Sequence, residues 1–289
     1  MSVSLLALPS LSYAQSSGSH GEKGKRYNTE WKTLKALDPK YEVQQLTTSD
    51  NLDNKMYLGV DPYVPSMNSV VFMSDRNGAQ NLYLMSLKDG SFRQVTASDE
   101  LDGNHSNVSP ATEEAFFREG RTIKRVSLNA PYKEQAVYTA DKKYDIKGIV
   151  ALTGNGKTIA LSLNYDDDKR SDLVTIDVKT GKQTTVKTID GKVDHVLVNP
   201  TGTHLVYHIY KDDEVGVIDI ESKDKKLLTK SGDHGVHPFW GDATNAGFVL
   251  KLDDKKPLEQ IVIYNTKKDK IKRYDIDVKG NHFAINSTG

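Results

Sequence analysis

Short stretches in which apolar residues alternate with polar ones recur from residue 57 to residue 275. Clear examples are NLYLMSL, DLVTIDV and EVGVIDI. A period of two places successive side chains on opposite faces of a strand, and the Asp-Gly, Thr-Gly and Lys-Asp pairs near these stretches are typical of hairpin turns. The pattern therefore predicts consecutive antiparallel strands over residues 57–275, with almost no helix.

The alternating stretches belong to a repeat of about 44 residues. Each unit reads as an apolar strand, a turn, two further strands and a short outer strand. The turn positions are Pro65, Pro110, Gly154, Pro200, Asp242 and Ser287, at intervals of 45, 44, 46, 42 and 45 residues. A four-stranded unit of about this length is typical of a propeller blade. The sequence predicts an all-β propeller domain over residues 31–289, with five complete blades and the start of a sixth; a β-sandwich with coincidental spacing is the alternative.

Both ends of the repeat bear on how the propeller closes. Residues 43–47, VQQLT, resemble the outer strands RQVT and KLLT, although no blade precedes them. Because an N-terminal strand that completes the last blade removes an exposed sheet edge, we expect this role for residues 43–47. The sixth unit has only one inner strand, so we expect an open arc or strained ring that lacks about a hundred residues of C-terminal blades.

The first 14 residues, MSVSLLALPSLSYA, contain a short apolar run that ends in small residues. Such an ending is typical of a signal-peptidase site, so the sequence predicts a signal peptide over residues 1–14 and a periplasmic or secreted protein. Polar residues 15–30 are expected to form a disordered linker. The leader is too short to span a bilayer and no later stretch is apolar enough, so no membrane span is expected.

Composition excludes several function classes. The 39 Lys and Arg residues balance the 39 Asp and Glu residues, so there is no electrostatic reason to expect nucleic acid as a partner. Cysteine is absent, which excludes disulfides, zinc–thiolate sites and a cysteine nucleophile. GNGK at 154–157 lacks the spacing of a phosphate-binding loop, and no Gly-x-Ser-x-Gly motif is present. Any metal chemistry must therefore use His, carboxylates or amides.

Four histidines share one position in the repeat, five residues before the turn. They are His105, His195, His237 and His282. In a propeller this position lies on the innermost strand, so we expect the four rings near one level around the central channel. Converging imidazoles can bind a divalent metal, or one can act as a base beside a metal held by the others. The alternative is a solvated channel lining in which histidine is merely tolerated.

Other candidate positions are weaker. Val60 and Ile149 occupy the same offset in blades one and three, and His204 and His208 lie one strand further out, where packing or surface roles are expected. SDRNG at 74–78 is expected to be a tight structural turn. DDDKR at 166–170 is expected to be a solvated loop from which Lys169 or Arg170 could reach an anionic ligand.

The order of these motifs resembles the oligogalacturonate lyase family. The resemblance runs from Trp31 through residue 289: EVQQLT, then NLYLMSLKDGSFRQVT and NVSPATEEAFFREGRTIKRVSL in the first two blades. HPFW at 237–240 resembles the family's His-x-Phe-Trp, and NHFAINSTG at 281–289 resembles its Ser-His-x-Met-Ser-Asn-x-Asp-Gly. SDRNG and the DGS…QVT pattern are shared with TolB-like propellers.

The resemblance implies a seven-bladed propeller that cleaves short oligogalacturonides by β-elimination with a manganese-type divalent ion. His237 matches a metal ligand of the family, and His195 matches its proton-abstracting base, although the proline that follows in the family is Val196 here. The other implied ligands come from a Gln-x-x-His-x-His run that this sequence does not contain. We therefore expect the chain to bind manganese weakly and to turn over its small acidic oligosaccharide substrate poorly.

Two other classes remain open from the sequence. A non-enzymatic, exported TolB-like propeller would use its channel or one face to bind a protein or peptide. The third class is the propeller domain of a prolyl-peptidase-like enzyme without its hydrolase half. The shared repeat position of the four histidines and the HPFW motif favour the lyase.

Overall fold

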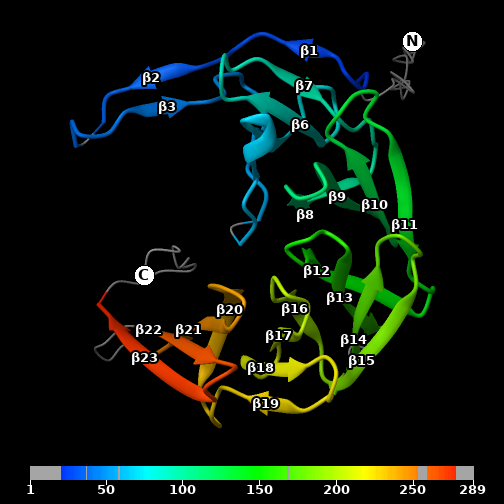
Figure 1. Cartoon of the computed structure of the whole chain (residues 1–289), viewed down its shortest axis with the longest axis vertical. Helices are drawn as coiled ribbons and strands as arrows, with labels where there is room; N and C mark the ends of the chain where they lie inside the picture. Colours follow the sequence, from blue (N-terminus) through cyan, green and yellow to red (C-terminus); the bar gives the residue numbers. More distant parts are fainter. Residues whose placement is uncertain (1–20, 37, 58, 168, 253–258, 278–289) are drawn as a thin grey trace, which may run out of the picture.

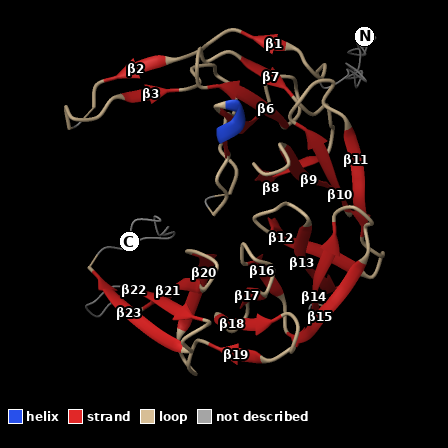
Figure 2. Cartoon of the chain, viewed as in Figure 1, coloured by secondary structure: helices blue, strands red, loops and turns tan. Residues whose placement is uncertain are grey.

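The computed structural model describes residues 21–36, 38–57, 59–167, 169–252 and 259–277. Over these ranges the chain is an arc of β-sheets arranged around a central space (Figure 1). The single helical element in this part of the chain is one 3-10 turn, η1 (Pro65–Met67) (Figure 2). The predicted all-β fold class is confirmed.

Five four-stranded antiparallel units follow one another along the described chain. Blade 1 has β4 (Tyr63–Val64), β5 (Ser69–Ser74), β6 (Asn81–Ser86) and β7 (Phe92–Gln94). Blade 2 has β8 (Leu101–Ser109), β9 (Glu114–Glu119), β10 (Thr122–Ser127) and β11 (Glu134–Thr139). Blade 3 has β12 (Tyr144–Leu152), β13 (Thr158–Tyr165), β14 (Arg170–Asp177) and β15 (Gln183–Asp190). Blade 4 has β16 (Val193–Val198), β17 (His204–Ile209), β18 (Glu214–Asp219) and β19 (Lys225–Leu227). Blade 5 has β20 (His234–Trp240), β21 (Asn245–Lys251), β22 (Glu259–Asn265) and β23 (Lys270–Ile276).

The first strand of each blade lies innermost and the fourth lies outermost (Figure 1). Five of the six predicted turn positions, from Pro65 to Asp242, fall between the first and second strands of their blades. The sixth, Ser287, lies outside the described residues. The prediction of five consecutive blades over residues 57–275 is confirmed.

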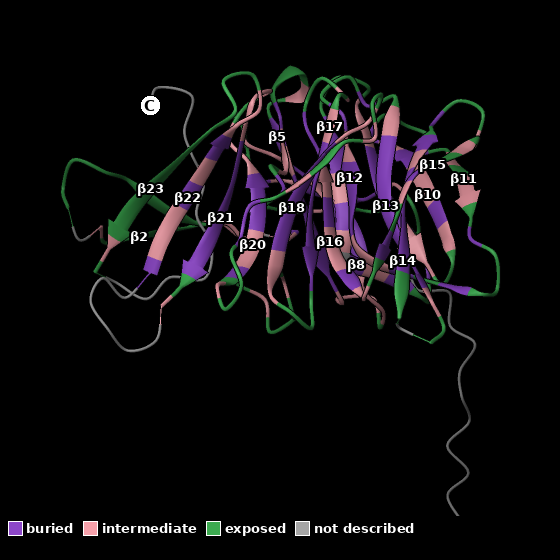
Figure 3. Ribbon diagram, turned by 90° about the horizontal axis from the view of Figure 1, so that it is seen from below, coloured by how far each residue is buried: buried purple, intermediate pink, exposed green. Residues whose placement is uncertain are grey.

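The hydrophobic core lies between adjacent blades. In β13, Ile159, Leu161 and Leu163 pack toward blade 2, whereas Ala160 packs toward blade 4. Successive residues of a strand point to opposite faces, so a strand between two blades is buried on both faces. The central strands of the arc are accordingly the most buried (Figure 3).

The N-terminal segment packs on the face of blade 1 that points away from blade 2. Its first strand, β1 (Arg26–Tyr27), pairs antiparallel with β7 as a fifth strand. The ring of Tyr27 stacks on Phe92 with centroids 5.0 Å apart. The expected disordered linker over residues 15–30 is therefore wrong for residues 26–27, because the polar sequence around Tyr27 hid an aromatic anchor.

Residues 43–47 do not take the outer-strand role expected for them. β2 (Lys32–Leu34) and β3 (Val43–Gln45) pair only with each other, as a two-stranded ribbon beside blade 1. The described blades form an open arc, with a gap between blade 5 and the β2–β3 ribbon (Figure 1).

Candidate active site

The inner strands are irregular where the candidate histidines lie. The register of β8 shifts between Asp102 and Asn107, and the register of β20 shifts between Val236 and Phe239. β12 and β16 have comparable shifts, at residues 147–151 and 193–195. A bulge adds a residue to one strand, kinks it and re-aims the neighbouring side chains. The repeat position five residues before each turn therefore falls within or at the edge of a bulge on these four strands.

Two of the four predicted histidines come together. His195 on β16 and His237 on β20 belong to adjacent blades, and their ring centroids lie 6.3 Å apart. His237 has a φ of 53°, a left-handed conformation that a non-glycine residue rarely adopts. Both side chains are half-buried. His282 lies outside the described residues.

Sequence reasoning missed two residues that contact His195. Asp194 precedes it, and His208 lies directly opposite it on β17. His208 Nδ1 forms a 2.7 Å hydrogen bond with Asp194 Oδ1, while His195 Nδ1 lies 3.0 Å from the same oxygen at an angle too oblique for a good hydrogen bond. The expectation that His208 is merely a packing or surface residue is incomplete: it is buried, but it belongs to this polar cluster. The Asp-His pair at 194–195 was a visible signal in the sequence.

The cluster continues from His208 toward the surface. Asp213 Oδ1 lies 3.5 Å from the buried Nε2 of His208, and Asp213 Oδ2 lies 3.1 Å from Nδ1 of the exposed His234. His204, by contrast, packs near Trp240 and bonds the hydroxyl of Thr203, in agreement with the role expected for it.

Tyr57 reaches the cluster from the segment that precedes blade 1. Its hydroxyl lies 2.9 Å from Nε2 of His195, across 138 positions of sequence. Burial, and next the negative charge of Asp194, raise the pKa of Tyr57 to about 12, so the phenol stays protonated near neutral pH. No feature of the local sequence around Tyr57 indicated this contact, because it depends on how blade 1 and blade 4 are placed.

The segment that carries Tyr57 runs from β3 into the centre of the arc (Figure 1). Its base is fixed to blade 1 by Arg76, whose guanidinium forms ion pairs with Asp53 at 2.9 Å and Glu30 at 2.8 Å. Arg76 also lies 4.4 Å over the ring of Phe92. The SDRNG turn therefore has the structural role expected for it, and it also anchors the segment that positions Tyr57.

Asp194 is held in its charged form. Burial alone would raise the pKa of this carboxyl group, but the close polar contacts and charges of His195 and His208 outweigh burial and lower the pKa well below its usual range. A carboxylate that stays ionised against a neighbouring imidazole can orient the ring and stabilise its protonated form. The pair thus has the arrangement of a general base and its positioning carboxylate.

His105 lies in a separate polar group on blade 2. Its Nδ1 is 2.7 Å from Asp102 Oδ2, and the guanidinium of Arg118 contacts the same carboxylate. Among the described residues, His105 therefore contacts this group and not the other candidate histidines. Its side chain is 31% exposed, so it remains open to a ligand.

Lys169 and Arg170 lie at the turn between β13 and β14 and are exposed. Arg170 stacks over Tyr165, with its guanidinium carbon 4.0 Å from the ring centroid. The hydroxyl of Tyr165 is fixed in turn by Asp172 at 3.1 Å. Neither cation contacts His195 or His237 in the described structure.

Asp194, His195 and His208 also have the composition of a metal site. One ligand atom from each lies within 4.8 Å of the others. Two imidazoles and a carboxylate suit a divalent transition ion. The described residues therefore provide both a candidate base and a candidate divalent-ion site.

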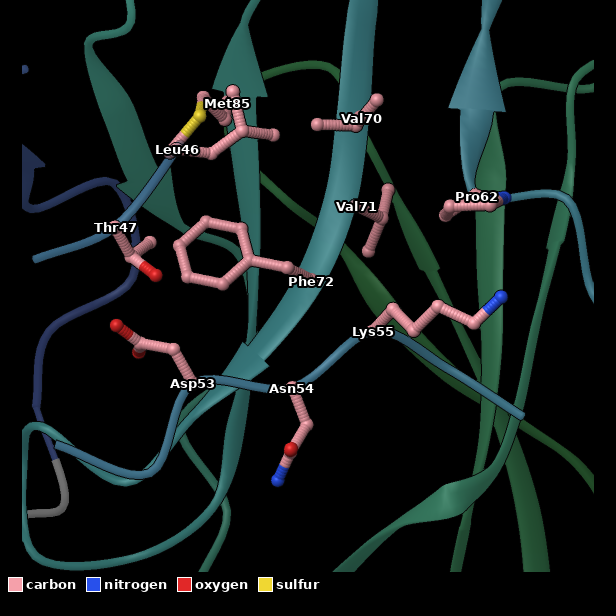
Figure 4. Close-up of a pocket in the computed structure, with 10 residues that line it drawn as sticks. All are labelled: Leu46, Thr47, Asp53, Asn54, Lys55, Pro62, Val70, Val71, Phe72 and Met85. Carbon is pink, nitrogen blue, oxygen red and sulfur yellow. The ribbon is translucent and has the colours of Figure 1, made fainter. Parts of the chain in front are cut away.

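A hollow on blade 1 has different chemistry. It has a volume of about 210 Å³ and is lined by apolar side chains such as Leu46, Phe72 and Met85, with Asp53 and Lys55 at its rim (Figure 4). Asp53 is already engaged by Arg76. This hollow has none of the candidate histidines in its lining.

No family model matches the sequence, and no curated protein matches it. Solved structures match the fold. An oligogalacturonate lyase in complex with manganese has a TM-score of 0.79 and 18% identity, over 87% of this chain and 73% of that chain. An oligogalacturonate lyase from Vibrio parahaemolyticus has a TM-score of 0.77 and 17% identity, over 87% of this chain and 73% of that chain. TolB from Acinetobacter baumannii has a TM-score of 0.57 and 14% identity, over 88% of this chain and 61% of that chain. The resemblance seen in the sequence is thus matched at the level of the fold, with lyase propellers ahead of TolB.

Proposed function

We propose that this protein is an oligogalacturonide lyase that cleaves short, acidic, pectin-derived oligosaccharides by β-elimination. The observation that carries the proposal is the placement of His195 beside His237 on adjacent blades, in a fold shared with oligogalacturonate lyases. The motif HPFW at 237–240 supports the same assignment.

His195 is the base in this proposal. Because its Nδ1 faces the Asp194 carboxylate, the neutral ring carries its proton on Nδ1 and presents the lone pair of Nε2. Tyr57 must then release Nε2 when a uronate enters. His195 takes the C5 proton, the electrons of the C5–H bond form the C4=C5 double bond, and the C4–O bond breaks. The leaving sugar oxygen keeps the C4–O electron pair and takes a proton from water. Asp194 stabilises the resulting imidazolium.

The metal implied by the resemblance fits only in part. His237 is the one member of the implied ligand set within the described residues, and a single imidazole holds a divalent ion weakly. When bound, such an ion, manganese in the related structure, would neutralise the uronate carboxylate and make the C5 proton more acidic. No step above depends on it, and slow turnover is the expected result.

Substrate charge and location follow the same proposal. His105, Lys169 and Arg170 are the candidates for contacts with further uronate carboxylates, because each is cationic or can become so and each is at least partly exposed. The apolar leader at 1–14 supports a periplasmic or secreted location. Among the described residues, no helix is long and apolar enough to cross a membrane.

The test is elimination from digalacturonate with manganese present, followed by ultraviolet absorbance of the unsaturated product. We expect slow but measurable formation by the wild-type protein. His195→Ala should lower the turnover about 100-fold or more because general base catalysis is lost. His237→Ala should raise the manganese concentration required, and His204→Ala, on the neighbouring strand, should change neither quantity.

Wild-type rates in His195→Ala would remove His195 from the mechanism. If the wild-type protein neither binds manganese nor forms unsaturated product, the lyase proposal fails. The TolB-like binding propeller, whose fold the chain also shares, would then be the better class.

A further inference from the structure

The polar cluster on blade 4 has a geometry that a base and its positioning carboxylate do not require. Asp194 and His195 are adjacent on β16, and His208 is their cross-strand neighbour on β17. Both imidazoles direct Nδ1 toward the same carboxylate oxygen, at 3.0 Å and 2.7 Å. A single base needs one such contact, so the second imidazole requires another explanation.

The other nitrogen of each ring has an outer partner. Nε2 of His195 meets the hydroxyl of Tyr57 at 2.9 Å, and Nε2 of His208 lies 3.5 Å from a carboxylate oxygen of Asp213. Metal-bound histidines usually donate their second ring N–H to such an oxygen, which fixes the tautomer and the ring orientation. In an ion-bound form Nε2 would be protonated in both rings and both Nδ1 lone pairs would face an ion beside Asp194, whereas the ion-free His195 described above carries its proton on Nδ1.

Burial strengthens this interpretation. The His208 side chain is 5% exposed, and its Nε2 has no hydrogen-bond partner of good geometry in the described residues. The Nδ1 atom of His195 is likewise buried without such a partner. Buried polar atoms are normally satisfied, so the His195 Nδ1 atom indicates that a group is missing beside Asp194, whereas the His208 Nε2 atom lies on the other side of its ring, toward Asp213.

We propose that Asp194, His195 and His208 form a chelate site for a divalent cation of the zinc class, bound by Nδ1 of both imidazoles and the Asp194 carboxylate. None of these three residues is the metal ligand implied by the family resemblance, which is His237. Three protein ligands leave a fourth position for water, as in zinc sites that stay open.

The donor set selects the ion. Imidazole nitrogen favours Zn²⁺, Ni²⁺ and Cu²⁺ over Mn²⁺, which follows the general order of affinities for divalent ions. Two nitrogens and one carboxylate therefore bind zinc more tightly than manganese. Binding also displaces protons from the Nδ1 atoms, so zinc affinity falls as the pH is lowered.

One consequence rests on the proposed function. An ion on Nδ1 of His195 leaves the proton on Nε2, the atom that would accept the C5 proton. Zinc at this site therefore blocks the base, and zinc added to manganese-supplemented protein should abolish elimination. The site is thus an inhibitory one.

The test is direct zinc binding by titration calorimetry, together with the visible spectrum of bound Co²⁺, on the full chain. The wild-type protein should bind one zinc ion at the cluster. His208→Ala and Asp194→Asn should each weaken zinc binding at least about 10-fold, since loss of outer partners alone costs that much. His204→Ala, on the same strand as His208, is the matched control and should bind as wild type. His237→Ala should retain the site.

Thermal unfolding keeps the test independent of misfolding. Zinc should raise the melting temperature of the wild-type and His204→Ala proteins because it binds only the folded state, and should raise that of Asp194→Asn much less.

Three results would overturn the site: no zinc binding by the wild-type protein, unchanged zinc affinity in both ligand variants, or an equal loss of zinc affinity in His237→Ala. Zinc binding of the expected pattern without any elimination would leave the site standing and sink the lyase proposal instead. Elimination that zinc does not inhibit would remove the inhibitory role.

Discussion

Individual carboxylates in this protein stay ionised because cationic or imidazole groups surround them. Asp102 is the clearest case away from the zinc-class site. Burial would raise the pKa of its carboxyl group, but the hydrogen bond and charge of His105, and then the charge and hydrogen bond of Arg118, outweigh burial and lower it. The charged form is therefore favoured more in the folded chain than in the unfolded chain.

The lowered pKa predicts loss of stability in acid. Above the ordinary Asp value of 3.8 the contribution of Asp102 is complete, and it is lost as the pH falls from there through the lower folded-state pKa. Asp102→Asn should reduce the free energy of unfolding at pH 7 by roughly 1–2 kcal/mol, and the difference from wild type should shrink below pH 4. Urea unfolding at a series of pH values measures both effects; a difference that stays constant with pH would contradict the assignment.

Among the strands and turns, the bulged inner strands decide where the polar side chains point. Gly148 lies in the β12 bulge with a φ of 74°, and a Cβ atom there would lie 2.4 Å from the backbone oxygen of Asp194. Backbone cannot move aside as a flexible side chain can. The glycine therefore lets blade 3 approach the strand that carries His195.

Gly148→Ala tests this close approach. Left-handed backbone alone costs about 1–3 kcal/mol, and the clash with Asp194 should add to that cost. Gly120→Ala is the control, because Gly120 also has a positive φ, of 54°, but open space around its Cβ position. Urea unfolding should show a larger loss for Gly148→Ala, together with weaker zinc binding in that variant alone. Equal losses in the two variants would mean that the contact between the blades is not limiting.

For the whole molecule, one buried arginine ties three distant segments together. Arg76 joins Glu30 of the N-terminal segment and Asp53 at the base of the Tyr57 segment to blade 1. Its side chain is 5% exposed. Two carboxylates left without this cation would be costly, since breaking a buried ion pair typically costs about 3–5 kcal/mol.

Arg76→Met should therefore lower the free energy of unfolding by about 3–5 kcal/mol and loosen both attached segments. Hydrogen exchange measured by mass spectrometry should become faster over residues 26–34 and 49–57, while blades 3 and 4 keep their protection. Arg273→Met removes a partly exposed pair, with Asp233 at 3.5 Å, and serves as the control with an expected change within about 0.5 kcal/mol. Unchanged exchange in Arg76→Met would show that other contacts hold the segments.

The sequence by itself determined the blades and the position of the candidate histidines within them. Strand alternation and hairpin turns are local properties, so the repeat placed five blades, and the turns between their first and second strands, correctly. The shared offset also placed His195 and His237 on adjacent inner strands. These features follow from residues that are close together in sequence.

Only the tertiary structure decided which side chains meet. Tyr57 reaches His195 across 138 positions, and Arg76 joins segments that no local pattern relates. The bulges that aim His237 and expose the chelate-like arrangement around Asp194 depend on neighbouring strands rather than on local propensity. The N-terminal strand β1 formed for the same reason: pairing with β7 and stacking on Phe92 stabilise a segment whose own composition predicts disorder.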